Sequence, residues 1–465
     1  MPSVDLIVEN GHIVLSSVIF DADILINEGK IQGLKKTASD IEAQKRIDAS
    51  GLVIFPGVID AHVHFLEPGG SQREDFESGT KAAASGGVTT VFEMPISSLP
   101  VTSATSLNER RAMLEKKACV DFALYAGAGT HNYENIPELA RAGAIGFKTF
   151  LAYPKNRDSW YKGTYMTDNY SLLHSLEAIS ATGLPLSAHS EDDSIIEGRT
   201  KELQEKGRRD FKAHDESRPI SSETIAVSTV ISLARSTGAR VHIAHMSSGQ
   251  AAQLVKEAKQ SGAKITSETC PQYLVLEDND LATLGPYAKV NPPIRTGKKN
   301  RDELWDGIMT GTIDFVASDH APWTRLEKDP GFDDIFKANS GIPGTETLFP
   351  LLLSQAVEGR LSLNTLAKIT SESQARIFNI YPRKGSIQVG SDADLALVDL
   401  KKEKKLDRST MISKSRETNP YDGRAIIGVP VTTIVRGQVV MRDGVLEGKV
   451  GMGKFITPLT LAKES

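Results

Sequence analysis

Cysteine is scarce in this sequence: Cys119 and Cys270 are the only two in 465 residues. Two isolated cysteines do not form a disulfide framework, so we expect a protein of a reducing compartment, the cytoplasm. Long apolar runs are also missing, since no stretch approaches the roughly 18 residues of a membrane-spanning helix. The first residues carry Asp5 and Glu9 and lack a basic region followed by an apolar one. We therefore expect neither a signal peptide nor a membrane protein.

An excess of positive charge is absent as well. The chain has 54 basic and 59 acidic side chains, a formal net charge of −5, and this balance gives no electrostatic footprint for nucleic acid. Hydrophobic residues make up 40% and charged residues 24% of the chain, which is typical of a globular protein rather than a disordered one. A chain of 465 residues exceeds one ordinary core, which predicts one large domain and a smaller one.

Between residues 50 and 360, short apolar runs rich in β-branched residues alternate with longer amphipathic stretches such as 222–236 and 249–260. Eight strands alternating with helices over roughly 300 residues predict an α/β fold, a (β/α)₈ TIM barrel. An open doubly wound sheet is the main competitor, but no G-x-G-x-x-G motif follows the first strand to support its dinucleotide-binding variety. The eight runs are LVIFPGVIDAHVHF, GVTTVFEMP, CVDFALYAGAG, AIGFKTFLAY, LPLSAHSED, RVHIAHMSS, AKITSETCPQY and IDFVASDHAP.

The two ends of the chain have a different sequence pattern from the middle. Residues 4–35 are predicted to form short alternating strands with Asn-Gly and Glu-Gly turns, and GSIQVGSDADLALVDL and VTTIVRGQVVMRDG, within 385–444, follow the same pattern. We therefore predict a small β-sandwich domain built from both chain termini, residues 1–53 and 381–450. The barrel would occupy 54–380, and 451–465 would form a peripheral C-terminal tail.

Polar side chains with metal-binding chemistry stand where several apolar runs end. His62 and His64 point to the same face of the first strand because they are two residues apart. Taken alone, this pair fits a polar strand end as well as a metal site. His189, His245 and Asp319 end three further runs, and active sites of such barrels lie at the carboxyl ends of the strands. Imidazole together with carboxylate suits zinc or another divalent first-row metal.

Other polar residues have less definite meanings. Lys148 lies within the apolar run AIGFKTF and would need a carboxylate partner, because a buried unpaired ammonium is costly. A cation beside metal-bound histidines would be repulsive, which leaves its chemical state open. His242 is three residues from His245, so we expect it to face the opposite side and pack against helices. The charged segment 201–218 is interpreted as a solvated face or a mobile segment near the rim. Four histidines without a ligand pattern are expected at the surface or in turns: His12, His131, His174 and His214.

An ordered set of motifs resembles the cyclic amidohydrolases, a family that includes allantoinases, hydantoinases (dihydropyrimidinases) and dihydroorotases. The motifs are PGVIDAHVHFLEPG, GFKTF, AHSED, AHMSSGQ, TCPQYLVL, VNPPIR and SDHAP. The resemblance implies that Lys148 is carbamylated by carbon dioxide and bridges two divalent ions, which we expect to be Zn²⁺, with Mn²⁺, Co²⁺ and Fe²⁺ as alternatives. One ion would be held by His62, His64, Lys148 and Asp319, and the other by Lys148, His189 and His245. Asp319 would act as general base and then as general acid on a hydroxide shared by the two ions.

The resemblance also bears on the substrate, a small cyclic amide. Leu66 stands where dihydroorotases typically carry an arginine that grips the substrate carboxylate, which disfavours that activity. The stretch HFLEPGGSQREDFESGTKAAASGGVTTVFEMP resembles allantoinases. Tyr153 instead matches the hydantoinase tyrosine that hydrogen-bonds the developing oxyanion. Asn291 stands where both groups often have a serine that contacts the ring, and Ser340 and Gly341 are further candidate substrate contacts.

We therefore predict an allantoinase, with a hydantoinase as the alternative. A non-catalytic relative would have lost ligands, whereas all six ligand positions are kept, and a deaminase of the superfamily would lack the bridging lysine. By analogy with the family we expect a homo-oligomer, a tetramer or dimer.

Overall fold

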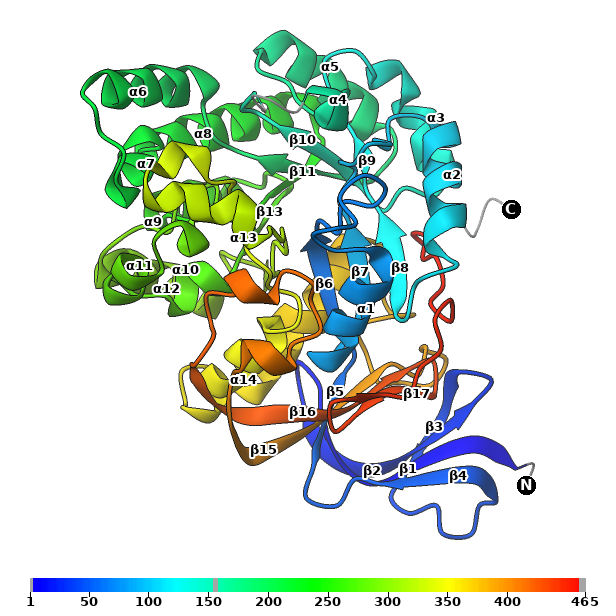
Figure 1. Ribbon diagram of the computed structural model, residues 1–465. Helices are drawn as coiled ribbons and strands as arrows, with labels where there is room; N and C mark the ends of the chain where they lie inside the picture. Colours follow the sequence, from blue (N-terminus) through cyan, green and yellow to red (C-terminus); the bar gives the residue numbers. More distant parts are fainter. Residues whose placement is uncertain (1–2, 154–157, 460–465) are drawn as a thin grey trace.

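Two kinds of β-sheet organise the chain (Figure 1). The computed structural model describes residues 3–153 and 158–459. A nine-stranded sheet lies at the bottom of Figure 1, and strands surrounded by helices fill the upper part. Within the described part of the chain, no helix combines the length and the apolar character needed to cross a bilayer.

The upper part contains parallel strands in chain order. β6, β7 and β8 form one parallel ladder, and β9 to β14 form another. Only Tyr125 separates β8 from β9, and Val63 forms a parallel bridge with His320 just beyond β14. Each of the eight predicted runs contains a strand of these ladders, with these bounds: β6 Val58–Val63, β7 Val88–Glu93, β8 Asp121–Leu124, β9 Ala126–Gly127, β10 Phe147–Phe150, β11 Pro185–His189, β12 Arg240–Ile243, β13 Ile265–Thr269 and β14 Phe315–Val316.

Helices follow most of these strands and bury one face against them. The predicted helix 249–260 is α9, whose buried residues Ala251, Val255 and Ala258 recur at helical spacing. The predicted helix 222–236 lies within α8, which ends at Gly238 in a left-handed conformation. The helices are α1 Phe76–Ser85, α2 Ala104–Leu114, α3 Ile136–Arg141, α4 Asp158–Tyr161, α5 Asn169–Ser180, α6 Asp193–Glu205, α7 Phe211–Ser217, α8 Ile220–Thr237, α9 Gly249–Gln260, α10 Pro271–Val275, α11 Asp278–Leu284, α12 Lys298–Met309, α13 Arg325–Lys328, α14 Leu348–Val357, α15 Leu363–Ala367 and α16 Ser373–Ile377.

The nine-stranded sheet combines strands from both ends of the chain. Its strands form one continuous sheet with a shared core rather than two separate sheets of a sandwich, because β5 pairs with β1 on one side and with β15 on the other. β5 reaches Pro56, three residues beyond the predicted boundary. The strands are β1 Val4–Val14, β2 Ile19–Asn27, β3 Lys30–Lys35, β4 Ala43–Asp48, β5 Val53–Pro56, β15 Leu395–Lys405, β16 Ala425–Val435, β17 Gln438–Arg442 and β18 Val445–Leu446.

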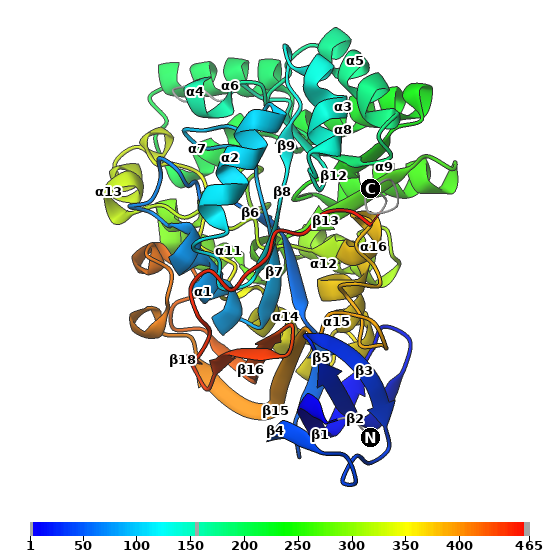
Figure 2. The ribbon, with the colours of Figure 1, turned by 90° about the vertical axis from the view of Figure 1, so that its right-hand side faces the viewer.

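The C-terminal segment is not the peripheral tail that we expected, as far as the structure describes it. It runs from the nine-stranded sheet up beside the parallel strands (Figure 2). Phe122 in β8 donates a backbone hydrogen bond to Lys454 and accepts one from Ile456 (3.0 and 2.7 Å). The Ile456 side chain is buried in an apolar cluster that includes Ala123 and Tyr125. This apolar packing explains the difference, because the segment covers the edge of β8.

Candidate metal centre and active site

Three predicted ligands meet at the carboxyl ends of β6 and β14. The Nε2 atoms of His62 and His64 each lie 3.3 Å from Oδ1 of Asp319, and the ligand atoms of the three residues lie within 4.8 Å of one another. The preceding residue, Ser318, is fixed by hydrogen bonds from its backbone N and Oγ to Asp60 (3.0 and 2.5 Å). Two imidazoles and a carboxylate at this spacing can hold one divalent ion.

The other two predicted histidines form a second pair. Nδ1 of His189, at the end of β11, lies 3.0 Å from Nε2 of His245, which follows β12. The His245 and His62 ring centres are 5.4 Å apart, so the pair adjoins the first group. Burial is the main cause that lowers the pKa of both His62 and His245 well below the usual range. Both imidazoles are therefore neutral and can offer a lone pair to a metal ion.

Lys148 in β10 is fully buried, and its Nζ has no hydrogen-bond partner among the residues that the structure describes. Burial lowers its pKa to about 8, although the carboxylates of Glu268 and Asp319 oppose the shift. Nε2 of His62 and Nδ1 of His245 are also buried, and the described part of the chain offers them no hydrogen-bond partner. Native proteins rarely leave such atoms unsatisfied. This group of orphaned nitrogen atoms fits residues that are completed by bound metal ions and by modification of the lysine.

Burial raises the pKa of the Asp319 carboxyl group, but neighbouring His62 and His64 outweigh burial and hold it below its usual range. Asp319 is therefore a carboxylate in the metal-free protein. It can act as a metal ligand and as an acceptor of protons. Its backbone has a positive φ of 48°, an uncommon conformation for a residue other than glycine that often marks functional sites.

Glu268 in β13 is a site residue that our sequence analysis missed. Its carboxylate accepts hydrogen bonds from Nδ1 of His62 and from the backbone N of His245 (3.2 Å). It thereby fixes which nitrogen of His62 carries the proton and leaves Nε2 facing Asp319. Glu268 is the penultimate residue of β13, so the rule that found Asp319, a carboxylate near the carboxyl end of a strand, could have found it too.

The prediction for His242 is wrong. Its Nε2 lies 3.2 Å from Oε2 of Glu268, and its ring stacks on Phe315 with centres 4.8 Å apart. His242 therefore lies beneath the predicted metal ligands, not on the opposite side of the strand. Strand alternation fails here because β12 ends at Ile243 and His245 has a positive φ of 35°.

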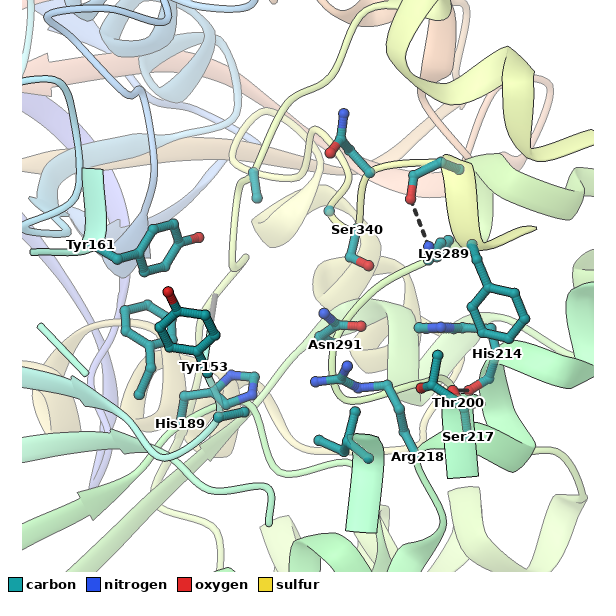
Figure 3. A pocket seen from close by; sticks show the side chains of 18 of the residues that line it. Tyr153, Tyr161, His189, Thr200, His214, Ser217, Arg218, Lys289, Asn291 and Ser340 are labelled. Atoms are coloured by element: carbon teal, nitrogen blue, oxygen red, sulfur yellow. Dashed lines mark hydrogen bonds between the residues drawn. The ribbon is translucent and has the colours of Figure 1, made fainter. Parts of the chain in front are cut away.

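A cavity of about 500 Å³ opens beside these ligands, a volume in the range of small-molecule sites. Figure 3 shows Tyr153 and Tyr161 on one side, and Arg218, Asn291 and Ser340 across from them. The cavity lining contains four predicted metal ligands and all five predicted substrate contacts, namely His64, His189, His245 and Asp319, with Leu66, Tyr153, Asn291, Ser340 and Gly341.

Local contacts hold several of the predicted substrate contacts in place. The Tyr153 backbone N donates to Asp193 Oδ1 at 2.9 Å, which ties its loop to α6. Leu66 is 2% exposed and has a positive φ of 58°. Asn291 lines the cavity, and its buried side-chain oxygen has no hydrogen-bond partner among the residues that the structure describes. Their roles toward a substrate stay predictions.

The charged segment 201–218 is only partly a solvated face. Arg208 forms exposed ion pairs with Asp210 and Glu216 (2.7 and 3.0 Å). His214 was expected at the surface but is 4% exposed, and its Nε2 donates to the carbonyl of Val290 at 2.9 Å. His214 and Ser217 on the buried face of α7 line the cavity, together with Arg218 at the C-terminal end of that helix.

Comparisons with known proteins agree over nearly the whole chain. Residues 53–440 match the amidohydrolase family. An L-hydantoinase of Paenarthrobacter aurescens is 37% identical over 97% of this chain and 98% of its own length. An allantoinase of Solibacter usitatus is 35% identical over 97% of this chain and 96% of its own length. The solved structure of an L-hydantoinase (dihydropyrimidinase) from Arthrobacter aurescens has a TM-score of 0.94 and 36% identity, and covers 98% of this chain and 100% of its own.

Proposed function

Because the chain belongs to the amidohydrolase family, we propose that it is a metal-dependent hydrolase that opens the ring of allantoin. It is a cyclic amidohydrolase, an enzyme that acts on C–N bonds in cyclic amides. The observation that carries the proposal is the group of His62, His64 and Asp319, whose ligand atoms lie within 4.8 Å of one another beside the cavity.

We further propose that the two parallel ladders close into one (β/α)₈ barrel. Support comes from the strand order, which follows the sequence, and from the bridge between Val63 and His320. The structural match to the L-hydantoinase supports the same arrangement. In such a barrel the ligands come from the carboxyl ends of several strands, where active sites of this fold lie.

In this proposal a carbamylated Lys148 joins two ligand groups. His62, His64 and Asp319 would hold one divalent ion, and His189 and His245 the other, with Zn²⁺ the metal that we propose. When bound, the ions supply an activated water nucleophile and polarise the substrate carbonyl. Carbamylation by carbon dioxide would turn the Lys148 amine into a carboxylate-bearing ligand. This modification would explain why its buried Nζ lacks a hydrogen-bond partner among the described residues.

The chain's own residues would then move the protons. Asp319 Oδ1 lies between the two histidines of β6, where it would take the proton of the nucleophile and pass it to the leaving ring nitrogen. The Tyr153 hydroxyl, on the opposite side of the cavity from Asn291 (Figure 3), would donate to the oxyanion that develops on the carbonyl. Asn291, Ser340 and Gly341 would hold the ring.

Features of the cavity favour allantoin, whose ring carries a polar ureido group. Thr200, Asn291 and Ser340 bring hydroxyl and amide groups to one side of the cavity (Figure 3). Leu66 places no cation at the position where a dihydroorotase would need one. A hydantoinase is the second candidate, because Tyr153 lines the cavity and an L-hydantoinase is among the relatives.

Two measurements test the proposal. Mass-spectrometric metal analysis of protein purified without chelators should find two divalent ions per chain; well under one ion would refute it. Parallel assays on allantoin, hydantoin, dihydrouracil and dihydroorotate should give the highest kcat/KM for allantoin. A higher kcat/KM for hydantoin would show that the enzyme is a hydantoinase, the second candidate.

A further inference from the structure

We propose that Glu191 and Arg218 are positioning residues, which hold His189 for metal binding through a buried network that also supports the loop carrying His245. The inference rests on the proposed metal-dependent function. It assigns a role to two residues that lie outside the predicted ligand set, and it connects the wall of the substrate cavity to one of the two ligand groups.

Glu191 lies directly behind His189. Its Oε2 is 2.8 Å from Nε2 of His189, and its side chain is fully buried. A carboxylate acceptor at Nε2 requires a proton on that nitrogen, so the lone pair of the neutral ring is on Nδ1. Nδ1 is the atom that lies 3.0 Å from Nε2 of His245. Glu191 therefore selects the tautomer of His189 that presents its lone pair beside the other ligand.

Arg218 compensates the charge of Glu191. Its Nε donates to Oε1 at 3.0 Å and its Nη2 donates to Oε2 at 2.6 Å. This two-pronged contact is the strong form of an arginine–carboxylate pair, and a fully buried carboxylate requires such a partner. Arg218 directly follows α7, and its guanidinium group lies at the cavity wall (Figure 3). It therefore separates Glu191 from the contents of the cavity.

The same network reaches the second histidine. Arg295 donates through Nη1 to the backbone carbonyl of Arg218 at 2.5 Å and through Nε to Oγ of Ser247 at 3.2 Å. Glu223 in α8 accepts hydrogen bonds from the backbone N and Oγ of Ser247 (2.8 and 2.9 Å). Ser247 is two residues beyond His245. The loops that carry His189 and His245 are thus joined by one buried hydrogen-bond network. This network fixes the separation of the two histidines before an ion binds.

The test compares the number and affinity of bound ions among purified variants. Glu191→Leu removes the acceptor, Arg218→Met removes the charge, and Arg218→Lys keeps the charge without the two-pronged geometry. Arg208→Met is the matched control, because it breaks an exposed ion pair in the same segment. Ions are counted by mass spectrometry after dialysis, and affinities are measured by Co²⁺ titration of the apoprotein, followed by visible absorption. Circular dichroism checks that each variant is folded.

We expect two ions per chain for the wild type and for Arg208→Met. Glu191→Leu and Arg218→Met should bind one of the two ions about 10- to 100-fold more weakly, the usual effect of removing a carboxylate behind a histidine ligand. Arg218→Lys should lie between them and the wild type, and it decides the test if Glu191→Leu does not fold. Folded variants that keep two ions with wild-type affinity would overturn the inference alone. A wild type that binds well under one ion would overturn the proposed function.

Discussion

Replacing Lys148 with methionine should abolish turnover and at the same time stabilise the metal-free protein. The Lys148 amine is fully buried and has no hydrogen-bond partner within residues 3–153 and 158–459, and burial lowers its pKa from 10.5 to about 8. A difference of about 2.5 pKa units, at roughly 1.4 kcal/mol each, means that holding the charged amine in place costs the folded state about 3 kcal/mol at pH 7. Methionine has a similar length and needs no partner.

The sign of the pH dependence separates this effect from general changes in packing. Between about pH 8 and 10.5 the unfolded chain keeps a proton on Lys148 that the folded chain has lost, so the free energy of unfolding of the wild type rises with pH in that window. The Lys148→Met variant lacks this contribution. The difference between the two proteins should therefore be largest below pH 8 and shrink toward pH 10.5.

The assay is urea unfolding, followed by circular dichroism, of both proteins after chelation in carbon dioxide-free buffer. We expect a higher free energy of unfolding for Lys148→Met at pH 7, by up to about 3 kcal/mol, and no measurable activity after metal is restored. A variant that is less stable than the wild type at pH 7 would refute the reasoning, because the buried amine would then not be a cost. Full activity in the variant would show that Lys148 is not part of the metal centre.

Three further changes give separate tests. Glu268→Leu removes the acceptor behind His62 and should lower kcat/KM on the best substrate about 10- to 100-fold; an unchanged value would show that Glu268 does not position this ligand. Burial is the main cause that lowers the pKa of His214 well below the usual range, so folding excludes its proton and the wild type should lose stability as the pH falls below about 6.5. His214→Gln should lose less stability than the wild type between pH 7 and pH 5 in urea unfolding, because the contribution of His214 is removed while those of the buried His62 and His245 remain, and an identical loss in both proteins would contradict the assignment. Arg110→Met leaves the fully buried Glu93 without its partner and should lower the free energy of unfolding by about 3–5 kcal/mol, whereas a wild-type unfolding midpoint would contradict this.

Sequence patterns pointed to those candidate ligands that stand out against an apolar background. Asp319 and His189 each end a short run of apolar residues, and the (β/α) alternation places the ends of parallel strands at the same edge. That reasoning needs only the order of apolar and polar residues, and it predicted the strands and two helices with nearly correct bounds. Lys148 stood out in the same way, but its chemistry came from the resemblance to a family and not from the pattern.

Features that depend on backbone geometry or on distant contacts could not be predicted in this way. The predicted orientation of His242 was wrong because the left-handed backbone at His245 interrupts strand alternation. The residue types at these positions do not indicate such a conformation. His214 looked like a surface residue within a charged segment, yet the carbonyl of Val290, 76 residues away, satisfies its buried Nε2. Likewise, the packing of Ile456 depends on β8, which lies far away in the sequence.

The buried charges around the proposed metal centre favour a carbamylated Lys148 over an unmodified, protonated one. Asp319, Glu268 and Glu191 contribute three negative charges, Arg218 offsets one of them, and all three carboxylates are buried. Carbamylation of Lys148 would add a further negative charge, so the protein would supply three in total. Two divalent cations and one hydroxide would together carry three positive charges and would bring the proposed centre to neutrality, the state that a buried site requires. With an unmodified, protonated Lys148, the same ions would leave a net positive charge in a buried site, which is a physical reason for the modification.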